Sequence, residues 1–383
     1  MLRILFVTGS LGHGGAERHA ITLMNRLSER RHQCHAVYIK NQPEQLARIR
    51  LRDGGTVRCL RATRYLDWRA VADLAAWISR IRPTVIVAAN PYALMYSALA
   101  RGISRVPLVV TYHSTRLLGV KEQLQMIAYR LLFWAANCTI FVCAAQKRHW
   151  VRRGVFSRRN EVIYNGVNTD EFRDRARPGQ RGLLRQALGF SALDYVIGIT
   201  AGLRPEKNHL QLVDAVAALR TMGIRARALL IGDGEMREAI EARAHELAVS
   251  ADVVITGFQS DVRPYVTACD AMALCSFTEA LSLGAIEAMA LNRPVVHSDI
   301  GGAPEIIFPG WNGFLFPVGD TQAFVDKLAV LANRALCRQM GNNARDIVEN
   351  LLSEQMMVKR YEEVLLELCG GRTSATKTAT QLQ

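Results

Sequence analysis

The chain has 383 residues, of which 50% are hydrophobic and 21% are charged, so it is long enough for two globular domains of ordinary composition. Its uncharged apolar runs are far shorter than the roughly 20 residues of a membrane-spanning helix, and the N-terminus lacks a signal-peptide cleavage pattern, so we expect a cytoplasmic protein. The formal net charge of +14 is concentrated in residues 1–168, which hold 26 basic and 8 acidic residues.

Strand-like and helix-like segments alternate along the first half of the chain. Each apolar run of strand length is followed by a helical pattern, the order of β-α-β units in a parallel sheet with helices on both faces. The predicted strand and helix pairs are 3–8 with 16–30, 85–89 with 93–101, 108–112 with 121–135, and 139–143 with 146–153.

The second half repeats this alternation after a polar, Arg-rich linker at 169–186. The predicted pairs are 196–201 with 208–222, 227–231 with 236–247, 253–256 with a turn at 261–268, and 271–275 with 282–290. We therefore predict an α/β fold of two Rossmann-like, doubly wound domains, 1–168 and 187–352, that face a cleft. We expect a final helix over 354–368 and a disordered tail over 369–383.

Residues 123–160 contain no acidic residue but seven basic residues, alongside Phe133, Trp134 and Trp150. Such a stretch favours a polyanionic partner, and we expect an anionic membrane surface, although a solvated face without a partner is the alternative. The isoelectric point near 9.7 also suggests a nucleic-acid binder. Because the chain has no RNP, KH or zinc-finger pattern, we expect no nucleic acid.

A glycine-rich loop follows the first predicted strand and contains Gly9, Gly12, Gly14 and Gly15. Glycines at this position let backbone N–H groups approach a phosphate or a sugar. The spacing does not fit the G-x-G-x-x-G fingerprint of dinucleotide-binding proteins, because Glu17 stands where the third glycine belongs. A nicotinamide dehydrogenase is therefore disfavoured, and a turn required only for packing stays an alternative.

Two cations follow the first strand of the second half, in the run from Gly202 to Asn208. Arg204 and Lys207 come after the carboxyl end of this strand, where open α/β sheets bind ligands. Together they can neutralise a diphosphate through charge-assisted hydrogen bonds. A solvated loop pair is the alternative.

Two carboxylates, Glu279 and Glu287, stand eight positions apart around the start of a predicted helix. With Ser282 as the N-cap, both flank the positive end of this helix. The first backbone N–H groups suit an anion, whereas the carboxylates, as acceptors, suit hydroxyl groups. A ligand that combines a diphosphate with sugar hydroxyls meets both demands; the alternatives are a capping carboxylate and a solvated helix face.

Taken together, these motifs resemble those of the family 4 glycosyltransferases, a retaining family with the GT-B fold that uses nucleotide sugars. The resemblance runs from residue 2 to about residue 368. Its most specific part is the E-x7-E run, followed by the Arg293-Pro-Val-Val and Gly301-Gly-Ala-Pro-Glu305 segments. It implies a hexose-type transfer from a UDP- or GDP-sugar to a lipid-linked or glycan acceptor, in cell-surface polysaccharide or glycolipid synthesis at the inner face of a membrane.

The resemblance also implies roles for individual residues. Arg204 and Lys207 correspond to the pair that binds the diphosphate, Glu287 to the carboxylate on the ribose, and Glu279 to the carboxylate near the donor sugar. The remaining donor-site positions are Gly14, Gly15, Gly202, Leu281, Ser282 and Leu283, and His113 corresponds to a histidine at the donor sugar. The first domain would bind the acceptor and the second the donor, and the helix 354–368 would pack back on the first domain.

The chain departs from the family pattern at two places, and the first of them leaves the donor open. The chain has Glu279-Ala-Leu where many relatives have Glu-Gly-Phe, and Asn292 replaces a common glycine. No D-x-D motif is present, so we expect no metal requirement and no cofactor besides the nucleotide sugar. Another GT-B enzyme, such as a sugar-nucleotide epimerase or a phosphorylase, is the alternative function.

Overall fold

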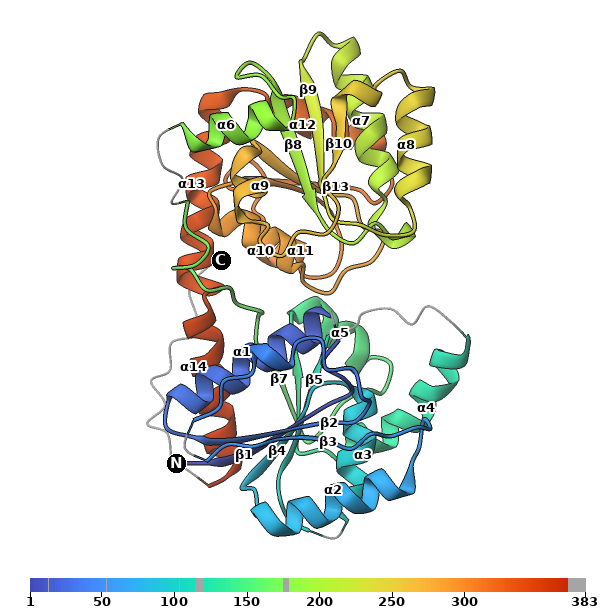
Figure 1. The fold of residues 1–383 in the computed structure, drawn as a ribbon, viewed down its shortest axis with the longest axis vertical. Helices are drawn as coiled ribbons and strands as arrows, with labels where there is room; N and C mark the ends of the chain where they lie inside the picture. Colours follow the sequence, from blue (N-terminus) through green and yellow to red (C-terminus); the bar gives the residue numbers. More distant parts are fainter. Residues whose placement is uncertain (13, 53, 103, 114–119, 175–178, 371–383) are drawn as a thin grey trace.

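The computed structural model describes residues 1–370 except 13, 53, 103, 114–119 and 175–178, and for 120–124 it describes the backbone only. Two all-parallel sheets form the cores of two domains stacked along the long axis of the molecule (Figure 1). Most of the predicted tail 369–383, and residues 175–178 of the predicted linker, lie outside the described part of the chain.

The first sheet has the strand order β3-β2-β1-β4-β5-β6-β7. One face is covered by α2, α3 and α4, and the other by α1 and by the last helix, α14. The elements are β1 Arg3–Thr8, α1 Gly15–Glu29, β2 Gln33–Tyr38, the 3-10 turn Leu46–Arg48, β3 Val57–Cys59, α2 Trp68–Ile81, β4 Val85–Ala88, α3 Pro91–Arg101, β5 Leu108–Tyr112, α4 Val120–Ala135, β6 Cys138–Phe141, α5 Ala144–Val151 and β7 Arg159–Val162.

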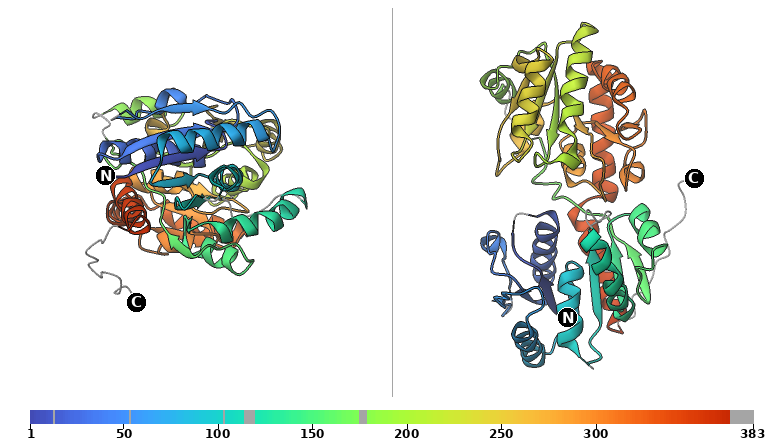
Figure 2. Two further views of the ribbon diagram at one scale, coloured as in Figure 1. Left: turned by 90° about the horizontal axis from the view of Figure 1, so that it is seen from below. Right: turned by 90° about the vertical axis from the view of Figure 1, so that its right-hand side faces the viewer.

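The second sheet has the strand order β10-β9-β8-β11-β12-β13. Helices again cover both faces, with α7, α8 and α12 on one side and α9, α10 and α13 on the other (Figure 2). The elements are α6 Gln180–Ala187, β8 Tyr195–Thr200, the 3-10 turn Pro205–Lys207, α7 His209–Thr221, β9 Ala226–Ile231, α8 Arg237–Glu246, the 3-10 turn Ser250–Asp252, β10 Val253–Ile255, α9 Arg263–Ala268, β11 Ala271–Leu274, α10 Leu283–Ala290, β12 Val295–Ser298, α11 Ala303–Ile306, β13 Gly313–Phe316, α12 Thr321–Leu331, α13 Arg334–Leu351 and α14 Glu354–Leu368.

The doubly wound, two-domain α/β fold predicted from the alternating pattern is therefore confirmed. Strands such as β4 and β8 are almost entirely buried, because helices cover both faces of a parallel sheet, and they read as continuous apolar runs. The prediction omitted several elements. Among them are the short edge strand β3, which has no fully buried residue, and α6, which lies inside the predicted linker.

The carboxyl edges of the two sheets face each other. The loop after β1 meets the start of α10, where a Cβ atom on Gly15 would lie 3.7 Å from the Leu283 Cδ1 atom. The loop after β6 meets the loop before α10, where the Cys143 thiol donates to the Ala280 carbonyl at 3.3 Å. In open α/β sheets, ligands bind beyond the carboxyl ends of the strands, so this interface is the place to look for a site.

Candidate active site

The N-terminus of α10 lies at the centre of this interface. Ser282 is its N-cap, and the Ser282 hydroxyl accepts from the Ala285 N–H at 3.3 Å. Gly284 packs directly on β8, because a Cβ atom there would lie 2.9 Å from the Thr200 carbonyl oxygen. This close approach fixes the first turn of α10 against the end of a central strand. The side chain of Leu281 is buried in the core, which leaves only its main chain for a ligand.

The two cations predicted to bind a diphosphate lie in different environments. Lys207 donates to the Glu279 carboxylate, with 2.5 Å between Nζ and Oε2. The loops that carry these two residues are joined by the backbone bond from Phe277 N–H to the Glu206 carbonyl at 2.8 Å. Arg204 follows Gly202 and is 67% exposed at its side chain, with Glu206 3.9 Å away. The guanidinium of Arg204 is therefore the more accessible charge at this edge.

Glu287 is buried and forms an ion pair across the domain interface. It is 5% exposed, and its Oε1 atom lies 3.1 Å from the Nη1 atom of Arg18 on α1. Burial raises the pKa of Glu287, and the nearby Arg18 guanidinium opposes this rise. The interpretation of Glu287 as a solvated helix face is therefore wrong.

The glycine-rich loop of the first domain leads into α1. Gly14 is the N-cap of this helix and Gly15 its first residue. The Glu17 side chain folds back over the helix N-terminus, where it occupies the position that a Cβ atom on Gly14 would need. Burial raises the pKa of Glu17. Gly14 therefore makes room for a carboxylate of its own chain, while Gly15 is exposed and adjoins the second domain.

His113 directly follows β5 and packs against a second histidine. Its ring centroid lies 4.7 Å from that of His19, and His19 in turn contacts the Tyr361 hydroxyl of α14 at 3.1 Å. Burial lowers the pKa of His113 to about 4, so the imidazole is neutral at pH 7. Its Nε2 atom is buried and has no hydrogen-bond partner among the residues that the structure describes. A neutral imidazole in this state can still bond to a hydroxyl group.

A third acidic residue, Glu305 of α11, links the two domains. Its carboxylate accepts from the Ala144 N–H at 2.8 Å and the Ala145 N–H at 2.6 Å. It also accepts from the Tyr164 hydroxyl at 2.9 Å. Glu305 of the second domain therefore caps the N-terminus of α5 in the first domain. Sequence reasoning named Glu305 only as part of a motif.

The structure thus brings Lys207 to Glu279, and Gly15 to Leu283. It places His113 against His19, a contact within the first domain. Sequence reasoning missed Arg18, because an exposed arginine one turn into an amphipathic helix carries no signal of its partner. Across the described ranges, no group of three or more His, Cys, Asp or Glu residues could hold a metal ion.

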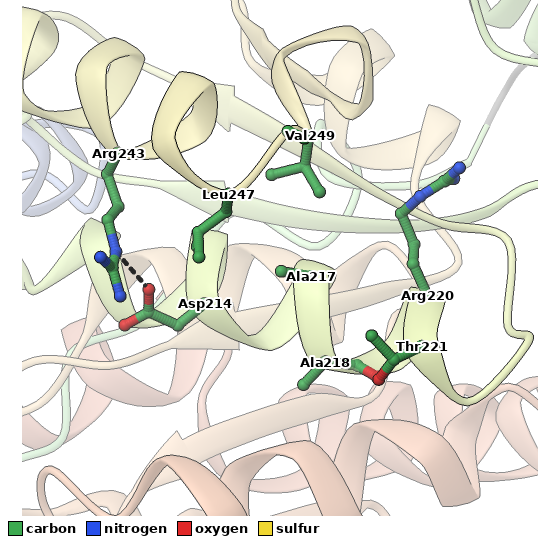
Figure 3. A pocket seen from close by; sticks show the side chains of 9 residues that line it. Asp214, Ala217, Ala218, Arg220, Thr221, Arg243, Leu247 and Val249 are labelled. Carbon is green, nitrogen blue, oxygen red and sulfur yellow. Dashed lines mark hydrogen bonds and ion pairs between the residues drawn. The ribbon is translucent and has the colours of Figure 1, made fainter.

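A separate surface cavity of about 630 Å³ lies between α7 and α8 (Figure 3). Its walls include Ala217, Leu247 and Val249, and Asp214 pairs with Arg243 at 2.7 Å beside it. The cavity lies where both helices end, so it adjoins the amino edge of the sheet. None of the site residues predicted from the sequence lines it, and we assign it no role in the active site.

Comparisons with known proteins agree with this geometry. Residues 13–171 match the family described as Glycosyltransferase Family 4, and residues 180–347 match Glycosyl transferases group 1. The chain is 31% identical over 225 residues to the putative glycosyltransferase EpsD of Bacillus subtilis, a match that covers 57% of this chain and 59% of EpsD. The chain thus spans less than two thirds of the length of that relative.

Two further similarities cover more of the chain. It is 22% identical over 307 residues, 78% of each chain, to the UDP-Gal:alpha-D-GlcNAc-diphosphoundecaprenol alpha-1,3-galactosyltransferase of Escherichia coli. The crystal structure of Anabaena HepE in complex with UDP superposes with a TM-score of 0.84 at 24% identity, covering 96% of this chain and all of HepE. The GT-B fold is therefore confirmed, and the chain belongs to the family 4 glycosyltransferases.

Proposed function

We propose that the chain is a retaining glycosyltransferase that moves a hexose-type sugar from a UDP- or GDP-sugar to a hydroxyl group of a lipid-linked or glycan acceptor. The observation that supports this most directly is the convergence of Lys207, Glu279, Glu287 and the N-terminus of α10 at the carboxyl edge of the second sheet. This edge faces the glycine loop of the first domain. The named activity of the Escherichia coli relative, galactosyl transfer to alpha-D-GlcNAc-diphosphoundecaprenol, supports cell-surface polysaccharide or glycolipid synthesis as the setting.

In this proposal, Arg204 and Lys207 bind the donor diphosphate together with the first N–H groups of α10. Glu287 accepts from the ribose hydroxyls, and Glu279 and His113 contact the donor sugar. The bond from the sugar to the diphosphate breaks as the acceptor oxygen arrives on the same face. Fixed positive charge around the departing diphosphate supplies the main stabilisation, the class of effect that is usually the largest in catalysis. A departing phosphate oxygen takes the proton of the acceptor.

A donor screen tests this assignment. UDP, GDP and their sugars should be compared by thermal shift, because a ligand at about 100 times its Kd stabilises a fold by roughly 2.7 kcal/mol. We expect one nucleotide class to stabilise the wild type and the effect to be lost in an Arg204→Ala, Lys207→Ala double variant. The matched control is Arg64→Ala, Arg105→Ala, two exposed arginines of the first domain. Equal stabilisation of both double variants would refute the assignment.

The metal requirement is tested separately. We propose turnover without an added divalent cation, since the positive charge on the diphosphate comes from side chains and a helix terminus. Donor hydrolysis or transfer should therefore continue in excess chelator. Loss of turnover that Mn²⁺ or Mg²⁺ restores would show that a metal ion takes part.

We further propose that the first domain docks on an anionic membrane surface at the cytoplasmic side. The helix α4, labelled in Figure 1, supports this proposal, since its residues Ile127, Leu131 and Trp134 recur at helical spacing and are 57%, 63% and 46% exposed. Exposed arginines, such as Arg152 and Arg158, lie in the same acid-free stretch. No helix in the described part of the chain is long and apolar enough to cross a membrane.

Vesicle binding tests this surface. At low salt, sedimentation with vesicles of anionic lipid should retain the wild type, each cation near the surface contributing about 1 kcal/mol. Vesicles of neutral lipid should not retain it. An Ile127→Ser, Leu131→Ser variant should bind more weakly, whereas the control Leu183→Ser, on the exposed face of α6, should not. If the wild type fails to bind anionic vesicles, the membrane proposal is wrong.

A further inference from the structure

A second site lies at the end of the second domain away from the proposed active site. A cavity of about 280 Å³ lies between α6 and the start of α13. The first residue of β8 and residues shortly before β11 and β12 complete its lining. Because the strands begin here, the cavity opens at the amino edge of the sheet, and Figure 1 shows α6 and α13 beside each other there. Its charged lining residues are Arg181, Arg185, Arg293, Arg334, Arg338 and Asp270.

The arginines come from two helices with matched spacing. Arg181 and Arg185 stand one turn apart on α6, and Arg334 and Arg338 stand one turn apart on α13. Residues four positions apart lie on the same helix face, so each pair lies on one side of its helix. The Arg185 guanidinium is buried and donates to the carbonyls of Ala268, Ser191 and Asp194, whereas Arg334 and Arg338 have no such set of partners in the described ranges.

The single lining carboxylate does not balance this charge. Asp270 pairs with Arg181 at 2.6 Å and with Arg185 at 3.3 Å. Arg334 donates to the Ala192 carbonyl at 2.6 Å, and neither Arg334 nor Arg338 has an ion pair within the described ranges. Arg293 is mostly buried and pairs with Asp174 at 3.2 Å, so it adds little to the uncompensated charge. The lining therefore carries a local excess of positive charge.

A buried hydroxyl group of the lining also has no partner. Tyr195 is 6% exposed, and its Oη atom is buried without a hydrogen bond among the residues that the structure describes. The Nε atoms of Arg181 and Arg185 are likewise buried and unbonded within those residues. Buried polar groups are nearly always hydrogen-bonded in native proteins, and exceptions often mark an absent water or ion. All three atoms belong to residues that line the cavity, and a ligand that accepts hydrogen bonds would satisfy them once their side chains turn to face it.

We propose that this cavity binds a small phosphorylated metabolite through its phosphate or diphosphate group. The forked guanidinium groups match phosphate oxygens, which accept two parallel hydrogen bonds from one arginine, and the Tyr195 hydroxyl can donate a further bond. A water molecule takes about 30 Å³ in the liquid, so a cavity of about 280 Å³ has room for a phosphate with a small organic substituent.

The site would also connect the two segments that join the domains. α6 follows the crossing from the first domain, and α13 leads through Ser353 into α14, which packs on the first sheet. An anion held between α6 and α13 ties these two connections together at their far ends.

Titration calorimetry with inorganic phosphate and pyrophosphate, at constant ionic strength, tests the proposal on the full chain. The pocket variant is Arg334→Ala, Arg338→Ala, which removes two positive charges. Neither arginine has an ion pair in the described ranges that the change would break. Arg64→Ala, Arg105→Ala is the control with the same change of net charge. Arg204→Ala reports any binding at the proposed donor site. Tyr195→Phe removes only the unbonded hydroxyl and keeps the packing of the ring. It therefore provides a second test if the pocket variant fails to fold.

We expect pyrophosphate affinity to fall at least tenfold in the pocket variant and roughly tenfold in Tyr195→Phe, since a hydrogen bond to a charged group has about this effect. Pyrophosphate affinity should be unchanged in the control and in Arg204→Ala. The proposal is wrong if the pocket variant and Tyr195→Phe bind pyrophosphate as the wild type does. It is also wrong if the control loses as much affinity as the pocket variant, or if Arg204→Ala alone abolishes binding. Absence of phosphate or pyrophosphate binding at millimolar concentration would also overturn it. Because pyrophosphate would also bind at the proposed donor site, the pocket variant and Tyr195→Phe are also compared with the wild type in the Arg204→Ala background, where the cavity is measured separately from that site.

Discussion

Glu305 holds the two domains together through a single carboxylate. Two of its three donors are the first N–H groups of α5, and the third is the Tyr164 hydroxyl, which follows β7. The nearby Glu305 charge adds to burial in raising the pKa of Tyr164. The change Glu305→Gln keeps the size of the side chain but removes its charge and turns an amide NH₂ toward one of the donors.

The expected cost has two parts. A hydrogen bond to an ionised group contributes about 1.5–3 kcal/mol, and the glutamine loses about one such bond. The negative charge at a partly buried helix N-terminus contributes about 0.3–2 kcal/mol more. We therefore expect Glu305→Gln to weaken the closed arrangement of the domains by about 2–5 kcal/mol, and Tyr164→Phe, which removes a single donor to the ionised carboxylate, by about 1.5–3 kcal/mol.

Small-angle X-ray scattering measures this effect directly, because loss of the link should increase the radius of gyration. Urea denaturation is a second readout, although a two-domain chain need not unfold in one step. Glu235→Gln, an exposed glutamate on the second domain, is the control for loss of one negative charge. If Glu305→Gln and Glu235→Gln have the same radius of gyration and the same urea midpoint, Glu305 does not hold the domains together.

Three further predictions follow from the described contacts. Glu287→Gln should weaken nucleotide binding about tenfold or more, whereas Arg18→Gln should not; equal losses would mean that Glu287 serves only to pair with Arg18. Lys207→Met should lower the apparent affinity for the donor, measured by thermal shift, roughly tenfold or more, because it removes a cation that the diphosphate would contact; an unchanged shift would contradict that role. Burial lowers the pKa of His209 to about 4, so this residue favours unfolding as pH falls from about 6.5 toward 4, by about 2 kcal/mol at pH 5. The His209→Asn variant should lose less free energy of unfolding between pH 7 and pH 5, as measured by urea titrations. If its free energy of unfolding falls as much as that of the wild type over this range, His209 is not the group responsible.

The fold could be predicted because its signals are local. Buried central strands read as apolar runs and amphipathic helices as a 3.6-residue period, so β4, β8 and α10 were found from residue type alone. Elements with weak patterns were missed, such as β3, which is an edge strand of three residues with no buried side chain. α6 was missed because it buries only Arg185. Short, polar elements are specified by their tertiary neighbours, which sequence patterns do not display.

The location of the candidate site was predictable from local signals, but the pairing of its residues was not. Charged residues next to glycines at strand ends pointed to the α10 edge, but sequence spacing does not reveal which cation pairs with which carboxylate. Asn292 illustrates what the structure adds. Its φ of +58° lies in the left-handed region, where Asn and Gly are the residues tolerated best. The asparagine can therefore replace the glycine common in relatives without a change of backbone, and this departure bears on local geometry rather than on the donor.

The charged groups of the proposed active site are largely paired with one another. Lys207 pairs with Glu279, and Glu287 pairs with Arg18 across the interface. Buried charges are costly unless they are paired, so these pairs stabilise the interface. A nucleotide sugar would have to exchange them, with its diphosphate replacing Glu279 at Lys207 and its ribose replacing Arg18 at Glu287. Arg204, exposed and only loosely paired, needs no such exchange, and we therefore infer that it makes the first contact with the diphosphate.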